Sequence, residues 1–373
     1  KLLSKRRLLV ENKGLRIFFL FGVIFVTQII YFSYFPVMTM VGFLLRLFIG
    51  YAVIRLVIDF PRLYIAALYS LCILALLSWG LGKTGLINNF ISMFPEVQYN
   101  KWSEISSYTL GFHTFYMSPD TGVLRNAGLF WEPGAFAGYI IVAIIFLSLG
   151  RESFTEKSYR RCLAIFILTL LTTMSTAGYL LLPLLFLLGY KFKAKKRETK
   201  FKPIVIFLLV LLIVSGSSTF IFKNVDFLQE KAVSQLEKTL TMSDYDLAYN
   251  NTRFGTLKFD WFYIKSSPLF GNGLHEATRY RYHGENRVGG QGNGLSDFVA
   301  KFGFLGFSFY MFFLYAGLVH CFGKSKKIFL SMIIMLASLS AEPFLNYPLY
   351  LSFMFLSCAY IKPVNLKGGT HGE

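Results

Sequence analysis

The chain has 373 residues, of which 54% are hydrophobic and only 16% charged, and its formal net charge is +18. This balance excludes an ordinary soluble domain and is typical of an integral membrane protein. The positive charge does not indicate a nucleic-acid partner, because the basic residues lie between apolar runs of roughly 18 residues or more.

The apolar runs predict transmembrane helices along the whole chain. A segment rich in Lys and Arg precedes the first run, at residues 17–35, and marks the N-terminus as cytoplasmic. The stretch at residues 163–190 is too long for one span and is interrupted at residues 175–178, so we divide it into two spans joined by a tight turn. The remaining spans are expected at residues 37–58, 63–81, 133–149, 203–222, 303–322, 328–340 and 349–361.

Two long polar segments, residues 82–132 and 223–297, connect these spans. In the second segment, the apolar spacing predicts a helix on the membrane surface at residues 225–240 and a further helix from about residue 251. The inner face of the further helix would carry Phe254, Leu257, Trp261 and Ile264.

The distribution of charge sets the expected orientation. Most of the 38 Lys and Arg residues fall in the short connections on the side of the N-terminus, which are therefore cytoplasmic. The two polar segments are then outer, periplasmic loops. We predict an all-α polytopic membrane protein of a single domain, with about ten transmembrane helices, both termini in the cytoplasm, and short helices in both outer loops.

The stretch from Arg125 to Gly138 places an arginine and a carboxylate directly before the span at residues 133–149. Pro133 suits the first helical position, so Glu132 falls at or next to the N-cap, close to free backbone N–H groups. Glu132 is therefore a candidate general base or a group that orients an acceptor, and the alternative is that it only caps the helix. Glu342 precedes a proline at another outer helix end, where capping is the favoured interpretation.

Arginine residues gather in the same two loops, and a guanidinium group binds phosphate oxygens bidentately. Arg253 coincides with a predicted helix start, where free N–H groups and the helix dipole also favour an anion. Phosphate binding is the preferred role, and the alternative for each residue is a solvated loop arginine. The loop arginines are Arg125 in the first loop and Arg253, Arg279, Arg281 and Arg287 in the second.

Several other residues have two interpretations. His275 and His283 are candidate proton carriers or bystanders in a wet loop, and Trp131 suits either an interfacial belt or a platform for a sugar ring. The glycine-rich run around Asn293 lacks the Walker lysine and a preceding strand, so as a nucleotide motif it is weak. Arg46 lies within a span, where it would pair with a polar group of the bundle or reach a lipid phosphate. Neither a CxxC pattern nor a Cys/His cluster occurs, so no metal site is expected.

Together these motifs resemble the bacterial O-antigen and capsular polysaccharide polymerases, within the wider group that includes the O-antigen ligases. Their order and their placement beside spans make the combination more specific than any one motif. The resemblance is carried by Arg125 to Gly138, by Ser175-Thr176-Ala177-Gly178-Tyr179, by Arg253 with Pro268, Gly271 and Gly273, and by Gly292-Asn293-Gly294-Leu295 with Lys301, Phe302, Gly303 and Gly306.

The resemblance implies an inverting, metal-independent glycosyltransferase without a cofactor, active in lipopolysaccharide or capsule biosynthesis. It would transfer the growing glycan from polyprenyl (undecaprenyl) diphosphate to the hydroxyl of an incoming lipid-linked repeat unit, at the outer face of the bacterial inner membrane. The expected partners are this lipid-linked oligosaccharide, membrane lipid and a chain-length regulator protein.

The resemblance also implies roles for the site residues. The leaving diphosphate would be held by Arg125 and Arg253, with Arg279 and Arg281 as further candidates. Glu132 is the first candidate for the base, ahead of His275 and His283. The acceptor sugar would contact Trp131, Asn293 and Glu342. The first loop and Arg253 of the second would then form a site between two loops.

Two departures favour a polymerase over a ligase. Ligases of this group carry a histidine where this chain has Gly292, and an arginine where it has Thr176. The ligase remains the first alternative. A transporter or flippase of lipid-linked glycan is the second, but it should show internal repeats and several ionisable residues within spans, and here only Arg46 fits.

Overall fold

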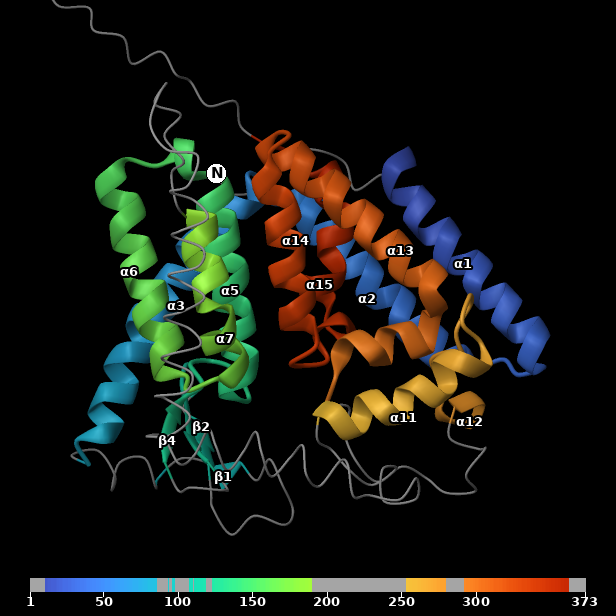
Figure 1. The fold of residues 1–373 in the computed structure, drawn as a ribbon, viewed down its shortest axis with the longest axis horizontal. Helices are drawn as coiled ribbons and strands as arrows, with labels where there is room; N and C mark the ends of the chain where they lie inside the picture. The colour runs from blue at the N-terminus through green and yellow to red at the C-terminus, as the bar shows by residue number, and fades with distance from the viewer. Residues whose placement is uncertain are drawn as a thin grey trace, which may run out of the picture.

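The computed structural model describes residues 11–85, 93, 96–97, 107–109, 111–118, 123–189, 253–279 and 292–361 (Figure 1). Within these residues the chain is mostly helical. The α-helices are α1 (Asn12–Phe32), α2 (Val37–Leu56), α3 (Phe60–Lys83), α5 (Pro133–Leu149), α6 (Glu156–Thr172), α7 (Thr176–Gly189), α11 (Arg253–Ser266), α12 (Glu276–Arg279), α13 (Gly294–Phe322), α14 (Lys326–Leu339) and α15 (Pro348–Ser352). The 3-10 helices are η1 (Arg151–Ser153), η3 (Phe344–Asn346) and η4 (Phe353–Cys358), and the strands are β1 (Glu96–Val97), β2 (Ser107–Thr109), β3 (Thr114–Met117) and β4 (Leu124–Asn126).

Four of the described helices, α1, α2, α3 and α13, are long and apolar enough to cross a membrane. They coincide with four of the predicted spans, while α5, α7 and the stretch Pro348–Cys358 are apolar but shorter. Large apolar side chains on α1 and α2, such as Ile30 and Met38, are exposed, as expected for helices surrounded by hydrocarbon. The predicted helices at residues 203–222 and 225–240 lie outside the described residues.

The predicted division of residues 163–190 into two helices is confirmed, but the break lies slightly earlier than predicted, at residues 173–175, because α6 ends at Thr172 and α7 begins at Thr176. The start of α6 is capped by Thr155, whose hydroxyl oxygen accepts the backbone N–H of Ser158. α6 and α7 therefore form a helical hairpin whose turn lies at the end of the bundle that carries the strands (Figure 1).

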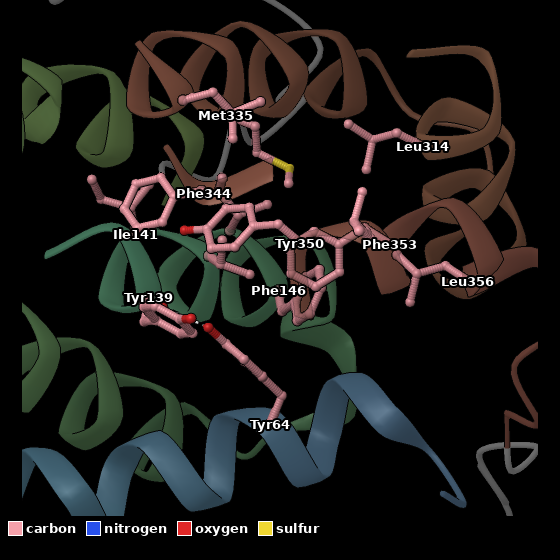
Figure 2. Close-up of a cluster of buried hydrophobic side chains, with 14 of the residues drawn as sticks. Tyr64, Tyr139, Ile141, Phe146, Leu314, Met335, Phe344, Tyr350, Phe353 and Leu356 are labelled. Carbon is pink, nitrogen blue, oxygen red and sulfur yellow. Dashed lines mark hydrogen bonds between the residues drawn. The ribbon is translucent and has the colours of Figure 1, made fainter. Parts of the chain in front are cut away.

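α5 is the central helix of the bundle. It is buried nearly from end to end, because α3, α6, α7 and α14 all pack against it, and this explains why its sequence is apolar on every face. Figure 2 shows aromatic side chains from several elements meeting beside α5. The Phe344 and Tyr350 rings stack with centroids 4.4 Å apart, and the Tyr64 hydroxyl donates to the carbonyl of Tyr139 at 2.9 Å. This packing fixes η3, which is separated from Glu342 only by Pro343.

Gly138 of α5 provides a test of this packing. A Cβ atom at Gly138 would overlap the ring of Phe344, which is fully buried and stacked on Tyr350, so the ring has no space to move. We expect Gly138→Ala to lower the free energy of unfolding by about 1–3 kcal/mol, although alanine is the better helix former. Gly42→Ala in α2 is the control, since a Cβ there meets nothing within 4 Å. Thermal unfolding of the two purified variants in detergent measures the difference, and equal midpoints would contradict the prediction.

α13 is broken at Gly303, whose φ of 67° lies in the left-handed region that favours glycine. The loop after α11 replaces the helical hydrogen bonds lost at this break. The carbonyls of residues 300–301 accept the N–H groups of residues 272–273, and the N–H groups of residues 304–305 donate to the carbonyls of residues 268–269. The Pro268, Gly271 and Gly273 motif therefore has a structural role in holding the loop against the kinked helix.

In the described part of the first polar segment, the structure has strands and none of the predicted short helices. This part forms a four-stranded antiparallel sheet in the order β1-β2-β3-β4, with Tyr116 opposite Arg125 in the last pair. Phe115, on β3, is buried, and a Cβ on Gly82 of α3 would lie 2.9 Å from its ring. The chain is therefore not all-α, and the sheet packs against the end of α3.

The predicted inner face of α11 is also wrong in part. Leu257 and Trp261 are about half exposed, whereas Thr256, Phe259, Asp260, Tyr263 and Ile264 are buried. The helix is rotated from the prediction because its buried face includes polar groups: the Ser296 hydroxyl donates to Asp260 at 2.6 Å. Hydrophobic spacing alone cannot find a face that is half polar.

Candidate functional site

Four charged side chains from distant parts of the sequence meet at one end of the bundle, and we call them the Arg–Glu cluster: Arg125, Glu132, Arg253 and Glu342. Arg125 lies on β4, Glu132 immediately before α5, Arg253 at the start of α11, and Glu342 between α14 and η3. The sheet and α11 occupy the same end of the bundle (Figure 1). The two polar segments therefore come together, as the sequence predicted.

Arg253 is the first described residue of α11, in agreement with the predicted helix start. Its Nη2 lies 3.1 Å from Oε1 of Glu342, and its Nε donates to the carbonyl of Ala341 at 2.8 Å. The Arg253 side chain is 33% exposed, against 11% for Glu342. The guanidinium group thus stands between a buried carboxyl and the surface.

Glu132 occupies the N-cap position of α5, but its side chain makes no capping hydrogen bond. Instead, Oε1 of Glu132 accepts the indole N–H of Trp131 at 3.1 Å, and its carboxyl lies within hydrogen-bonding reach of Glu342. Gly134 allows this approach, because a Cβ there would lie 2.5 Å from Oε1 of Glu342. The side chain of Glu132 therefore does not act only as a cap of α5.

The two carboxyls affect the protonation of the site. Burial, followed by the neighbouring Glu132 carboxylate, raises the pKa of Glu342 well above its usual range, and Arg253 only partly opposes this. A neutral Glu342 can still accept the Arg253 hydrogen bond through its carbonyl oxygen while it donates its proton towards Glu132. Because their side chains lie so close, the pair holds one proton more readily than two negative charges.

Arg125 is almost fully buried and joins the sheet to the α6–α7 turn. Its Nε donates to the carbonyl of Thr173 at 3.2 Å and its Nη2 to that of Met174 at 2.9 Å. Burial lowers the pKa of Arg125, while Tyr116 and Glu132 raise it. Arg125 therefore contributes positive charge to the cluster from a buried position. It also connects the Arg125–Gly138 motif with the motif at residues 175–179, which the sequence analysis treated separately.

Tyr347 is a residue of this region that the sequence analysis missed. Its ring lies 4.7 Å from that of Trp131, and both side chains are partly exposed. Burial, then Glu132 and Glu342, raises the pKa of Tyr347. Its position just before Pro348 offered no signal, because the contact depends on the turn through η3.

Arg279 and Asn293 do not belong to the cluster. Arg279 forms a buried ion pair with Asp297 at 2.9 Å, and the Asn293 side chain caps α13 by accepting the N–H groups of Leu295 and Ser296. These contacts give both residues structural roles.

Asp297 also pairs with Lys301, in a buried network that the sequence analysis missed. Lys301 reaches the side chain of Asn346 at 2.9 Å, and Arg46 donates to the Asn346 carbonyl at 2.8 Å. The pairing of Arg46 within the bundle follows one of its two predicted alternatives. Opposite charges at Asp297 and Lys301, four residues apart, were the available signal for this network.

The described histidine candidate, His275, makes its contacts outside the cluster. His275 lies against Tyr34, with ring centroids 5.1 Å apart, and its Nδ1 accepts the N–H of Ala277. His283, Arg281 and Arg287 lie outside the described residues. Glu132 and Glu342 are thus the carboxyls that the described structure brings to Arg253.

No family model matches the chain, and comparison with curated proteins and with solved structures gave no match. The case for a function therefore rests on the Arg–Glu cluster and on the sequence motifs that supply its residues.

Proposed function

We propose that this protein is a membrane glycosyltransferase that polymerises oligosaccharide repeat units. The substrate is a glycan on polyprenyl diphosphate, and the acceptor is a hydroxyl of an incoming lipid-linked repeat unit. The observation that carries the proposal is that Arg253 and Glu132, from two polar segments, both lie beside Glu342 and both interact electrostatically with Arg125. Cations suit the diphosphate, and a carboxylate suits the acceptor hydroxyl.

In the proposed reaction, the acceptor oxygen attacks the anomeric carbon of the donor glycan and the bond from that carbon to the diphosphate oxygen breaks. The configuration at the anomeric carbon inverts. The hydroxyl proton passes to the Glu132 carboxylate. Negative charge grows on the leaving diphosphate, where Arg253, with the buried charge of Arg125 behind it, stabilises the transition state.

The aromatic pair of Trp131 and Tyr347 supports the acceptor side of the proposal. Both rings have exposed surface beside the two carboxyls, and aromatic rings with a polar end suit a ligand that is partly apolar and partly hydroxylated. Glu132 is oriented by the Trp131 indole at 3.1 Å. A sugar ring on this pair would bring its hydroxyl to the carboxylate.

The proposal includes the topology expected from the sequence. About ten spans, with both termini in the cytoplasm, would place the Arg–Glu cluster at the outer face of the bacterial inner membrane. Both lipid-linked substrates would reach it from the membrane. The apolar helices α1, α2, α3 and α13 support the membrane location.

Reconstitution tests the function directly. We expect the purified protein in liposomes to convert a lipid-linked repeat unit into products that grow by whole repeats, read as a ladder on a gel. A single transfer to a lipid A acceptor without a ladder would indicate a ligase instead. Intact substrate that crosses the bilayer would indicate a transporter, and either result would overturn the polymerase proposal.

A further inference from the structure

Arg253 is engaged by a carboxyl of the chain itself. Its Nη2 lies 3.1 Å from Oε1 of Glu342, and its Nε is fixed by the carbonyl of Ala341. A phosphate oxygen uses the same guanidinium donors as a carboxylate oxygen. Glu342 therefore occupies a place that an anionic ligand of Arg253 would take.

Glu342 has little freedom to leave this place as an anion. Its side chain is 11% exposed, Gly134 packs against Oε1, and the Glu132 carboxyl lies within hydrogen-bonding reach. Without Arg253, an ionised Glu342 would be a buried negative charge beside another carboxylate, which is unfavourable. A neutral Glu342 avoids this, because its proton can be donated to Glu132.

We propose that Glu342 and a diphosphate ligand exchange places at Arg253, and that Glu342 takes up a proton when the diphosphate binds. The inference rests on the proposed function for the nature of the ligand. It deepens that proposal by making donor binding proton-coupled and by leaving Glu132 as the carboxylate that accepts the hydroxyl proton.

Binding of the diphosphate changes the charge around Glu342 in the direction that favours its protonation. Arg253 is the cation that the ligand takes away, and Glu132 is the negative neighbour that remains. Arg125 interacts with Glu132 and Arg253 from its buried position, and Tyr347 and Tyr350 are neutral hydroxyl groups near Glu342. The bound diphosphate adds further negative charge, so the complex binds the proton more tightly than the free protein does.

The sign of the pH dependence follows from this. Below the pKa of Glu342 in the free protein, the carboxyl is already protonated and diphosphate binding is independent of pH. Above that pKa, the protein takes up as much as about one proton for each ligand that binds, and the affinity falls by as much as about tenfold for each unit of pH. Because the pKa of Glu342 is raised well above the ordinary carboxyl range, the affinity is lost towards neutral and alkaline pH.

Calorimetry of the full-length protein in detergent measures directly the number of protons taken up when the ligand binds. The probe is a short-chain prenyl diphosphate monosaccharide, a diester whose phosphates do not titrate near neutral pH. Titrations in two buffers of different ionisation enthalpy, repeated from mildly acidic to mildly alkaline pH, give the protons taken up per ligand. The wild type should show an uptake that rises with pH towards about one proton, with a matching loss of affinity.

Glu342→Gln is the decisive variant, because it keeps a carbonyl oxygen for Arg253 and removes the charge. We expect no proton uptake, a flat pH profile and tighter binding than the wild type at alkaline pH. Glu156→Gln is the matched control, since Glu156 is a salt-bridged carboxyl at the start of α6, at the opposite end of the bundle, and it should behave as the wild type.

The outcomes separate the inference from the proposed function. If the wild type binds the ligand without proton uptake and Arg253→Gln abolishes that binding, the exchange is overturned and the diphosphate site is retained. Equal proton uptake by the wild type and Glu342→Gln also overturns it. Ligand binding that is absent, or unchanged in Arg253→Gln, overturns both. If Glu342→Gln fails to fold, the wild-type profile still decides, because a flat profile contradicts the exchange.

Discussion

Replacing Arg253 with alanine should abolish long polymer and reduce the rate of glycan transfer by about 10²–10³-fold. Arg253 carries the most exposed guanidinium of the described Arg–Glu cluster, and it lies at the start of α11, where the helix dipole adds to its charge. Its removal takes a cation from the leaving diphosphate when that group gains charge. Arg253→Lys should recover only part of the rate, since an ammonium group cannot bind two oxygens in parallel.

The matched control for this prediction is Lys258→Ala, which removes an exposed cation from the same helix. Both variants should reach the membrane in equal amounts, and only Arg253→Ala should lose the ladder in the reconstituted assay. A normal ladder from Arg253→Ala would remove the diphosphate site. Arg125→Ala should also lose polymer, but it is a less specific test, because Arg125 holds β4 to the α6–α7 turn.

The sequence predicted the described helices well because the signals for a span are local. The span at residues 133–149 coincides with α5, and the hairpin break before Thr176 was visible as a short polar interruption. Length and hydropathy decide such elements without knowledge of the neighbours. The strands were missed because each has only two to four residues and depends on its partners for stability.

The sequence predicted the cations of the candidate site better than it predicted the contacts between the residues of the site. Arg125, Glu132 and Arg253 were chosen because they stand beside spans or helix starts, which is a sequence property. The contact of Arg253 with Glu342 depends on the turn between α14 and η3, and that turn is set by the packing of Phe344 on Gly138. A contact across almost ninety residues that depends on packing leaves no periodic trace in the sequence.

The sequence also could not show which charged residues are buried. Arg279 looked like the other loop arginines, yet it is buried against Asp297. Asp260 is a charged residue of α11, yet it is buried and accepts a hydrogen bond from Ser296. Composition predicts that charged residues are exposed on average, and only the tertiary partner shows which ones are not.

Glu132→Gln should lower the rate of glycan transfer by about 10²–10⁴-fold, the range expected for the loss of a general base. Glutamine is nearly isosteric and keeps an oxygen for the Trp131 indole, so the local structure should be retained. It cannot accept the proton of the acceptor hydroxyl. Donor binding should persist, because Arg253 remains in place, and removal of a negative charge near the diphosphate should make it slightly tighter.

A pair of measurements distinguishes a base from a residue that only supports the fold. Initial rates of repeat addition should fall, while calorimetric binding of the prenyl diphosphate sugar and the thermal midpoint should stay near the wild-type values. Glu276→Gln, an exposed carboxyl on α12 at the same end of the bundle, is the control and should retain full rate. Wild-type rates in Glu132→Gln would remove this residue as the base. A fall in rate, donor affinity and thermal midpoint together would instead make Glu132 a structural partner of Glu342, because loss of the proton acceptor alone leaves the donor site and the fold intact.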